Sequence, residues 1–387
     1  MADLIIKPAT GDGNKLILQD KAGGAVLTTA DSGATIANID SVTAASIKLT
    51  PGSAPATTEG AIYYDSTSDK VNVWNGTAWE QISNLIGFEA KGTGGHITNY
   101  SIGSTNYVSH TFTTSGVFTP TSSFNVDYLV VGGGGGGGGA GEGNSASGGG
   151  GAGGFRTTTG LAVTAQAYTI TVGAGGTGGT AADNNFTATK GGDSIFSSIT
   201  STGGGAAPNS NNASTRPGNM DGGSGAGGSG NPSSGSGFPG ISLPVTSPVQ
   251  GYAGGTSNYS GNYPGGGGGG AGAVGTASPS TSVAGTGGAG KANYYRDGNS
   301  SGTTAGIHIF GGGGGGGIYA STSFAAGGTG GGGAGGGNAT TPGVNGNPYS
   351  GGGGGGTAGR GGAAGPTKNS QVGGSGGSGI VIIRYTI

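Results

Sequence analysis

Short runs of apolar residues separated by glycine-containing turns occupy the first part of the chain. Residues 4–6, 15–18 and 25–29 have the length and apolar character of strands, and a Gly-Asp-Gly-Asn turn lies between the first two. Strands this short bury too little area to be stable in one chain. We therefore expect residues 1–50 to form an attachment region that is stabilised by trimerisation or by docking onto a partner.

A second unit is predicted over residues 51–104, where apolar and polar residues alternate most regularly. Residues 62–65 and 70–74 alternate, and Asn75-Gly76 separates them from a third run at residues 77–82. Asn-Gly between alternating runs is the strongest short-range signal for a hairpin. The only two tryptophans, Trp74 and Trp79, are expected to cover one face of a small β-meander. This unit is interpreted as a structural module and connector.

The third predicted unit, residues 105–387, begins and ends with strongly apolar runs. Strands are expected within residues 106–131 and 161–200 and again at residues 379–387. The continuous β-branched run at residues 380–383 is typical of a strand buried on both faces. If the first and last strands share a sheet, they close the region between them at both ends. The expected fold class is mostly β and β-sandwich-like, with little or no α-helix.

The composition of the region between these strands is dominated by glycine. The chain has 103 glycines, and they form runs at residues 132–139, 148–151, 265–270, 311–317, 330–333, 335–337 and 351–356. Collagen is excluded, because the runs have no strict three-residue period and the chain has only 15 prolines. Disordered chains usually carry more charge than the 8% found here. Helices with about three residues per turn and no Cβ atoms can pack backbone to backbone. We therefore expect a bundle of polyglycine II helices.

Segments with a different composition separate the glycine runs and are rich in Tyr, Ser and Asn. These residue types on a rigid scaffold have the chemistry of an antibody paratope. The candidate receptor contacts are Tyr252, Tyr259, Tyr263, Tyr294, Tyr295, Arg296, Phe310, Tyr319, Phe324 and Tyr349. The alternative interpretation is that these side chains only cap the ends of the bundle.

Charge and residue content exclude several function classes. The net charge of −2 provides no basic patch for nucleic acid, and no apolar window is long enough for membrane insertion. The chain has no Cys, which rules out disulfides and thiolate metal sites. Its first residues lack the apolar core of a signal peptide, so we expect synthesis in a cytoplasm without ordinary secretion.

Catalytic and cofactor motifs are also weak. Residues 285–291 match most of a phosphate-binding loop, but Ala292 stands where Mg²⁺ binding requires Ser or Thr. The three His and four Glu residues are scattered along the chain, and Asp221 with Asp297 is the one carboxylate pair considered for glycan cleavage. We expect no enzyme, no cofactor and no metal site.

Three parts of the sequence resemble known families. Residues 3–40 resemble the N-terminal part of tail-fibre and appendage proteins of marine phages, and residues 62–79 are similar to a β module of phage fibres. Residues 105–387 resemble the glycine-rich domain family through Val130-Val131 before eight glycines, the run from Tyr168 to Gly176, and the closing run from Gly379 to Tyr385. The design also resembles the distal adhesins of T-even-like phages, in which stacked polyglycine II helices display loops that bind outer-membrane receptors.

These resemblances imply a virion protein made in the host cytoplasm. It would be a homotrimeric tail fibre or adhesin that contacts other tail proteins through residues 1–50. Its glycine-rich domain would bind a host outer-membrane protein or polysaccharide. Two alternatives stay open, a purely structural appendage such as a capsid fibre or fibre joint, and a glycan-degrading fibre.

Overall fold

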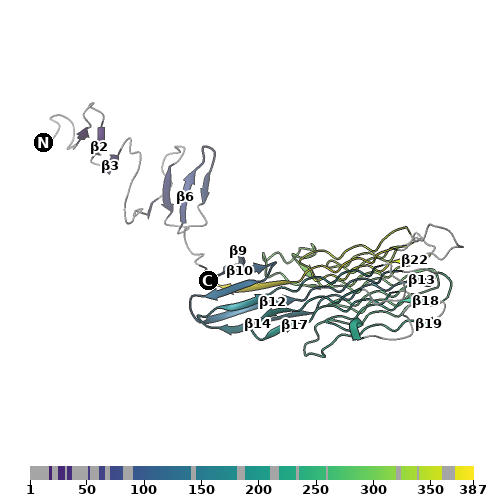
Figure 1. The fold of residues 1–387 in the computed structure, drawn as a ribbon. Helices are drawn as coiled ribbons and strands as arrows, with labels where there is room; N and C mark the ends of the chain where they lie inside the picture. Colours follow the sequence, from purple (N-terminus) through teal and green to yellow (C-terminus); the bar gives the residue numbers. More distant parts are fainter. Residues whose placement is uncertain are drawn as a thin grey trace. The chain divides into compact units, whose positions relative to one another are not determined.

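The computed structural model divides the chain into two units, Met1–Ile86 and Gly87–Ile387, and each is described by itself (Figure 1). The structure describes residues 17–19, 25–30, 33–36, 51–52, 61–65, 70–81, 90–140, 145–180, 188–209, 218–231, 235–258, 260–319, 324–337, 340–359 and 371–387. Most of the predicted attachment region, residues 1–50, lies outside these ranges. The second unit begins before the predicted boundary at residue 105, because strands from Gly92 onward join its sheets.

The first unit contains two small sheets. Its strands in chain order are β1 (Ile17–Gln19), β2 (Ala25–Ala30), β3 (Gly33–Ile36), β4 (Pro51–Gly52), β5 (Ile62–Asp65), β6 (Lys70–Trp74) and β7 (Trp79–Gln81). In the first sheet, β2 pairs antiparallel with both β1 and β3. In the second, β4 runs parallel to β5, and β5, β6 and β7 form an antiparallel meander. The meander predicted from the alternation is therefore confirmed.

Local turn chemistry fixes the register of β6 and β7. Gly76 has a φ of 94°, a left-handed conformation that glycine adopts without steric cost. The side-chain oxygen of Asn75 accepts the backbone N–H groups of Thr77 and Ala78, each at 2.8 Å. As a result, Trp74 lies directly opposite Trp79, with ring centroids 5.5 Å apart.

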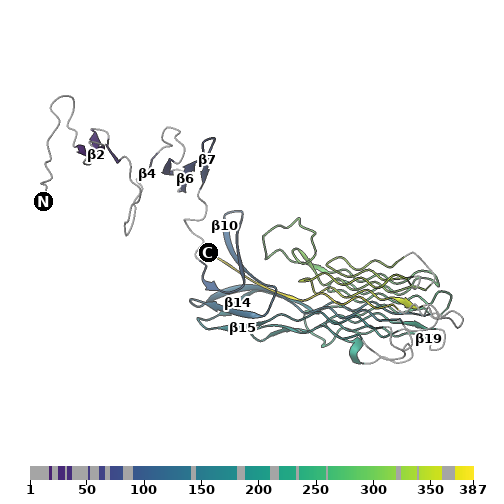
Figure 2. The same ribbon diagram turned by 45° about the horizontal axis from the view of Figure 1, so that its top comes forward.

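The second unit begins as a β-sandwich of two five-stranded antiparallel sheets (Figures 1 and 2). Its strands are β8 (Gly92–Thr93), β9 (His96–Ile102), β10 (Thr105–Phe112), β11 (Gly116–Pro120), β12 (Phe124–Val131), β14 (Phe155–Val163), β15 (Tyr168–Thr171), β16 (Ser194–Phe196), β17 (Ile199–Ser201) and β23 (Ile380–Thr386). One sheet has the strand order β14-β12-β23-β10-β9, and the other has the order β17-β16-β15-β11-β8.

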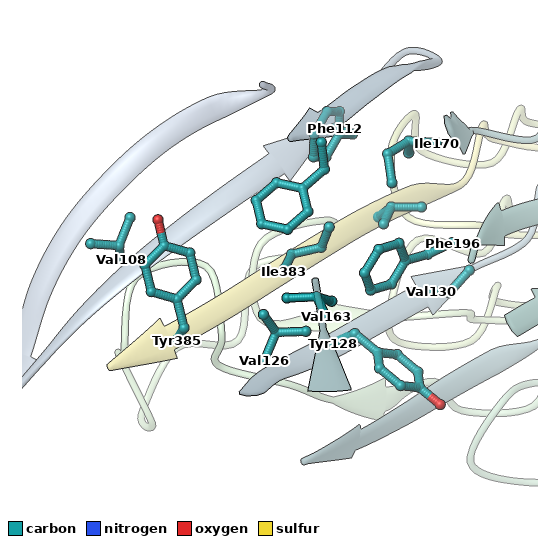
Figure 3. Close-up of a cluster of buried hydrophobic side chains, with 12 residues drawn as sticks. Val108, Phe112, Val126, Tyr128, Val130, Val163, Ile170, Phe196, Ile383 and Tyr385 are labelled. Carbon is teal, nitrogen blue, oxygen red and sulfur yellow. The ribbon is translucent and has the colours of Figure 1, made fainter. Parts of the chain in front are cut away.

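A cluster of buried hydrophobic side chains fills the space between the two sheets (Figure 3). Phe196 packs edge to face against Phe118 at 6.3 Å, against Tyr128 at 6.1 Å and against Tyr168 at 5.9 Å between ring centroids. Burying an aliphatic or aromatic side chain of this kind contributes roughly 1.5–3 kcal/mol. The core of the second unit therefore joins strands that are distant in the sequence.

The C-terminal strand β23 lies in the middle of its sheet. It pairs antiparallel with β12 on one side and with β10 on the other. Val381 and Ile383 point into the core between the sheets, and Ile380 and Ile382 belong to a second buried cluster on the opposite face. The prediction of a strand buried on both faces is confirmed. The glycine-rich region is thus closed by pairing between its first and last flanking strands.

Beyond the sandwich, the glycine-rich segments run side by side as a bundle of polyglycine II helices (Figure 2). The first run, residues 132–139, shows the packing rule. The N–H groups of Gly132, Gly135 and Gly138 donate to one neighbouring segment, the carbonyls of residues 154, 151 and 148. The N–H groups of Gly133 and Gly136 donate to the carbonyls of residues 192 and 189, and those of Gly134 and Gly137 donate to the carbonyls of residues 377 and 374. Three residues per turn therefore direct the donors to three neighbours in rotation.

The carbonyl groups of the same run face three further segments. They accept N–H groups from residues 176–179, 204–207 and 354. The run 132–139 is therefore surrounded by six parallel or antiparallel segments and is buried along its whole length. Each such hydrogen bond contributes about 1 kcal/mol net, which offsets the large entropy cost of ordering glycine.

The all-glycine runs are the interior helices of the bundle. Six of them are buried at every residue, at positions 132–139, 148–151, 265–270, 311–317, 335–337 and 351–356. A Cβ atom on Gly135 would overlap the carbonyl oxygen of Gly205, and one on Gly150 would overlap that of Gly135. Gly135 and Gly150 are not among the glycines with positive φ, so close packing requires glycine at these two positions.

The outer helices carry side chains on the face that points away from the bundle. In residues 173–180, Ala174, Thr177 and Thr180 are exposed, at the same three-residue spacing as the hydrogen bonds. In the described part of the chain, the only helical element of another kind is a 3-10 turn at Gly218–Met220. The mostly β fold class with little or no α-helix is therefore confirmed.

Candidate functional site

The bundle has two ends, and the candidate aromatic residues divide between them. At the near end the helices continue into the sandwich strands. At the far end a small sheet joins β13 (Ser145–Ala146), β18 (Gly230–Asn231), β19 (Gly235–Ser236) and β22 (Ala358–Gly359) (Figure 1). The predicted contact residues therefore do not form one continuous surface.

The far end carries Tyr263, Tyr319 and Phe324. The backbone N–H of Tyr319 donates to the carbonyl of Asn262 at 3.1 Å, which ties the end of one glycine run to the loop that bears Tyr263. Tyr263 has a φ of 47°, an uncommon conformation for a non-glycine residue. Phe324 is 46% exposed. The fourth candidate of this region, Tyr259, lies outside the described residues.

A long loop at the near end carries Tyr294, Tyr295 and Arg296. The two-residue strands β20 (Lys291–Ala292) and β21 (Ile309–Phe310) pair antiparallel and close it. The guanidinium of Arg296 donates to the carbonyl of Gly306 at 3.0 Å. All three candidate side chains are partly buried, so this loop is packed against the molecule.

Tyr295 forms part of a stack around Arg384 of strand β23. The guanidinium carbon lies 4.0 Å from the centroid of the Tyr295 ring and 4.5 Å from that of Tyr107. The same guanidinium donates to the carboxylate of Asp127 at 2.6 and 3.1 Å. Burial alone would lower the pKa of Arg384, but its hydrogen bonds outweigh burial and raise it. Tyr295 therefore has a structural role.

Tyr100 of strand β9 holds the same loop from the other side. Its hydroxyl donates to the carbonyl of Tyr295 at 2.8 Å, and its ring stacks on Tyr107 with centroids 5.6 Å apart. Burial is the main cause that raises the pKa of Tyr100 to about 12. The hydroxyl therefore stays protonated and donates at any physiological pH.

An Asp–His pair lies within the loop. The Nε2 atom of His308 lies 2.9 Å from a carboxylate oxygen of Asp297, and the Tyr294 ring centroid is 6.2 Å from the imidazole. The other carboxylate of the considered catalytic pair, Asp221, accepts the backbone N–H of Ile241 at 2.8 Å. Each carboxylate thus has a hydrogen-bond partner of its own.

Phe310 is a correction to the predicted contact set. Its side chain is fully buried and belongs to the cluster under the sandwich sheet, together with Leu129, Phe155 and Ile382. Because β21 places Phe310 directly before the interior run 311–317, its ring points into the molecule. A receptor would not reach it.

Tyr252 and Tyr349 are exposed at the near end. Tyr252 is 37% exposed and its N–H donates to the carbonyl of Gly270, one residue before the buried Ala271. Tyr349 is 43% exposed and its N–H donates to the hydroxyl of Ser378, close to the start of strand β23. Both lie away from the far-end aromatics.

Residues 238–249 form an exposed apolar loop that was not among the predicted receptor contacts. The exposed side chains include Phe238 at 62% and Val245 at 85%, with Ile241, Leu243 and Val249 also exposed. The buried side chain of Gln250 anchors the loop by accepting the N–H of Thr202 at 3.0 Å and donating to the carbonyl of Pro244 at 3.3 Å. In the sequence of this loop, Phe, Ile, Leu and Val recur with no charged residue between them. This pattern was the signal that could have indicated an exposed apolar surface.

An open hollow of about 370 Å³ lies between the turns that follow β8 and β10. It is lined by Gly94 and Gly95, by the Phe112 ring and by a run of hydroxyl residues from Thr113 to Ser115. His96 is its only ionisable residue. In the described ranges no three His, Cys, Asp or Glu residues converge as a metal site. Within the same ranges, no helix is both long enough and apolar enough to span a membrane.

Comparison with known proteins places the second unit in a family. No curated protein matches the chain significantly. A family model described as a glycine-rich domain matches residues 111–386, which span most of both sandwich sheets and the whole polyglycine bundle. The chain therefore belongs to the glycine-rich domain family.

Proposed function

We propose that the chain is a receptor-binding adhesin of a phage tail fibre that attaches the virion to the host cell surface. The observation that carries this proposal is the position of Tyr263, Tyr319 and Phe324 at the far end of a bundle whose backbone is hydrogen-bonded on all sides. A rigid support lowers the entropy cost of binding, and Tyr and Phe provide large contact areas.

The chemistry of the surface favours recognition by shape and stacking. Residues 222–290 contain no charged side chain, so electrostatic attraction contributes little along this part of the bundle. A neutral receptor surface fits this composition, either an outer-membrane protein or a polysaccharide. In this proposal residues 1–50 attach the chain to other tail proteins, and the assembled protein is part of the virion.

The test is competition for adsorption. Purified chain should block adsorption of the phage to its host, and a Tyr263→Ala/Tyr319→Ala/Phe324→Ala variant should lose at least about 10-fold in blocking potency, as expected for aromatic interface anchors. The matched control is Tyr252→Ala/Tyr349→Ala, which removes exposed tyrosines at the near end and should change potency less than about 2-fold.

Three outcomes contradict the adhesin proposal. If the wild-type chain does not block adsorption, a structural appendage explains the protein better. If phage lacking residues 205–350 adsorbs normally, the bundle is not the binding part. Release of sugars from host polysaccharide by the purified chain would indicate a glycan-degrading fibre.

A further inference from the structure

The chain contains two Asn-Gly pairs, Asn75-Gly76 and Asn345-Gly346. In such a pair the amide nitrogen of glycine can attack the side-chain carbonyl carbon of asparagine, because glycine has no Cβ atom that would hinder the approach. The attack closes a five-membered succinimide ring and releases ammonia. Its rate in a folded protein depends on whether the local structure lets the two atoms meet, and the two pairs differ in this respect.

The first pair lies in the turn between β6 and β7. Residues 75–78 are all exposed, and Gly76 has a φ of 94°. The Oδ1 atom of Asn75 accepts the backbone N–H groups of Thr77 and Ala78, each at 2.8 Å. These bonds fold the side-chain carbonyl over the turn, beside the peptide group of Gly76. Within the described ranges the N–H of Gly76 donates to no other residue, so its nitrogen is available for the attack.

The two donors on Oδ1 also favour the reaction itself. When the nitrogen of Gly76 bonds to Cγ of Asn75, negative charge develops on Oδ1. Two backbone N–H groups at 2.8 Å from this oxygen have the geometry of an oxyanion hole, which stabilises such a charge. The turn therefore activates the carbonyl group and also positions it, and positioning lowers the entropy cost of ring closure.

The second pair, Asn345-Gly346, is packed into the polyglycine bundle. The N–H of the buried Gly346 donates to the carbonyl of Ser375 at 2.8 Å, and Oδ1 of Asn345 accepts the N–H of Ser375 at 2.8 Å. A Cβ atom on Gly346 would overlap the carbonyl oxygen of Gly352, so the backbone has no room to bend toward the side chain. Ring closure at this pair would break both bonds to Ser375.

We propose that Asn75 is a site of spontaneous deamidation and that the bundle protects Asn345 from the same reaction. In the first step the N–Cγ bond between Gly76 and Asn75 forms, the Cγ–Nδ2 bond breaks, and the amide proton of Gly76 leaves with Nδ2 as ammonia. Water then opens the succinimide at either carbonyl, which gives aspartate or isoaspartate at position 75. The reaction needs no oxidant and no enzyme, and it does not depend on the adhesin function.

Either product alters the hairpin that carries both tryptophans of the chain. Aspartate places a negative charge on the turn, and isoaspartate adds a backbone carbon between residues 75 and 76. Trp74 and Trp79 are paired across this turn, with ring centroids 5.5 Å apart. Because the chain has no other tryptophan, its tryptophan fluorescence reports on this hairpin alone.

Both pairs can be followed in one sample of the full-length chain. Incubation at pH 8 and 37 °C, followed by proteolysis and mass spectrometry, gives the fraction of each asparagine that is converted. The folded chain should convert residue 75 at least about 10-fold faster than residue 345, since only the first pair can close the ring without disturbing packed structure. In urea, where neither local structure persists, the two rates should agree within about 3-fold.

The matched control is Asn75→Gln, because ring closure from glutamine would require a six-membered ring, which forms more slowly. In this variant residue 75 should stay unmodified and the fluorescence constant, while the emission of the wild type changes in step with the conversion of Asn75. Equal rates at residues 75 and 345 in the folded chain would overturn the assignment. So would conversion of residue 75 that is at least about 10-fold slower in the folded chain than in urea, since the fold would then protect this site too. Neither result would bear on adsorption.

Discussion

At the residue scale, glycine in the interior of the bundle is required because its neighbours leave no room for a side chain. Gly135 is the clearest position, since a Cβ would overlap the carbonyl group of Gly205. Gly205 in turn accepts the N–H of Gly151, so a shift of its carbonyl would also disturb a hydrogen bond. Gly218 is the opposite case, because it is exposed and has nothing within 4 Å of an added Cβ.

Gly135→Ala should therefore destabilise the second unit by about 3 kcal/mol, the upper end of the usual cost of overpacking. For a domain of this size we expect the melting temperature to fall by roughly 5–10 °C. Gly218→Ala should change the melting temperature by no more than about 1 °C, because the added methyl group meets no other atom and only restricts the unfolded chain. Differential scanning calorimetry measures both melting temperatures. Equal melting temperatures for the two variants would mean that lack of space for a Cβ atom is not the reason why residue 135 is glycine.

His110 is a buried histidine whose environment favours the neutral ring. Its Nδ1–H donates to the carbonyl of Gly94 at 2.7 Å, and its Nε2 accepts the hydroxyl of Tyr385 at 2.9 Å. Burial lowers the pKa of His110 from its ordinary value of 6.5, and burial also raises the pKa of Tyr385 to about 12. The phenol therefore remains a donor while the imidazole resists protonation.

This arrangement predicts a loss of stability in acid. The unfolded chain binds a proton at His110 near pH 6.5, whereas the folded chain binds this proton only at lower pH. The neutral His110 therefore contributes fully to the free energy of unfolding above about pH 6.5, and this contribution is lost as the pH falls. Urea unfolding between pH 5 and pH 8 should show this loss for the wild type. His110→Gln, which keeps polar atoms but does not titrate, should have a flatter profile. Identical slopes for the two proteins would show that His110 is not responsible.

At the element scale, sequence patterns identified strands whose signal is local. The Asn75-Gly76 hairpin and the buried strand β23 were both predicted, because turn chemistry and a β-branched run are properties of neighbouring residues. Strand β9 and the first part of β14 were not predicted, since each lies at a sheet edge and has polar residues between its apolar ones. Within the predicted strand region 161–200, a turn that includes Ser197, with a φ of 54°, separates β16 from β17.

The candidate contact residues show a different limit. Tyr295 and Phe310 have the same local context as the exposed aromatics, namely a loop between glycine runs. Their structural roles depend on Arg384 and Ile382 of strand β23, which are distant in the sequence. Composition thus predicted that aromatic loops exist. Only the pairing of the C-terminal strand shows which of their side chains pack against the rest of the second unit.

At the scale of the whole second unit, composition accounts for only part of the position of a segment in the bundle. The run 132–139 has six neighbouring segments, and in residues 173–180 the Ala and Thr side chains are exposed at a spacing of three. Residues 222–230, in contrast, are buried throughout although they include Ser224, Ala226 and Ser229. The strands β12 and β23 fix the first and last helices in one sheet, so the bundle begins and ends in a common anchor. The order of the helices could not be predicted, because glycine runs are interchangeable in sequence and carry no side chain that selects a neighbour.

Hydrogen exchange tests whether this bundle is rigid throughout. Glycine-selective ¹⁵N labelling would report on the interior runs 132–139, 265–270, 311–317 and 351–356, whose N–H groups donate almost throughout to another segment. Because opening one interior helix exposes the groups of all its neighbours, these amides should exchange only through cooperative opening, with protection factors of at least about 10³. Gly103 and Gly218, which are exposed and have nothing within 4 Å of an added Cβ, should exchange rapidly and serve as internal controls. Exchange of the interior runs within minutes, at the rate of the controls, would mean that the hydrogen-bonded lattice is not maintained in solution and that the far-end aromatics have no rigid support.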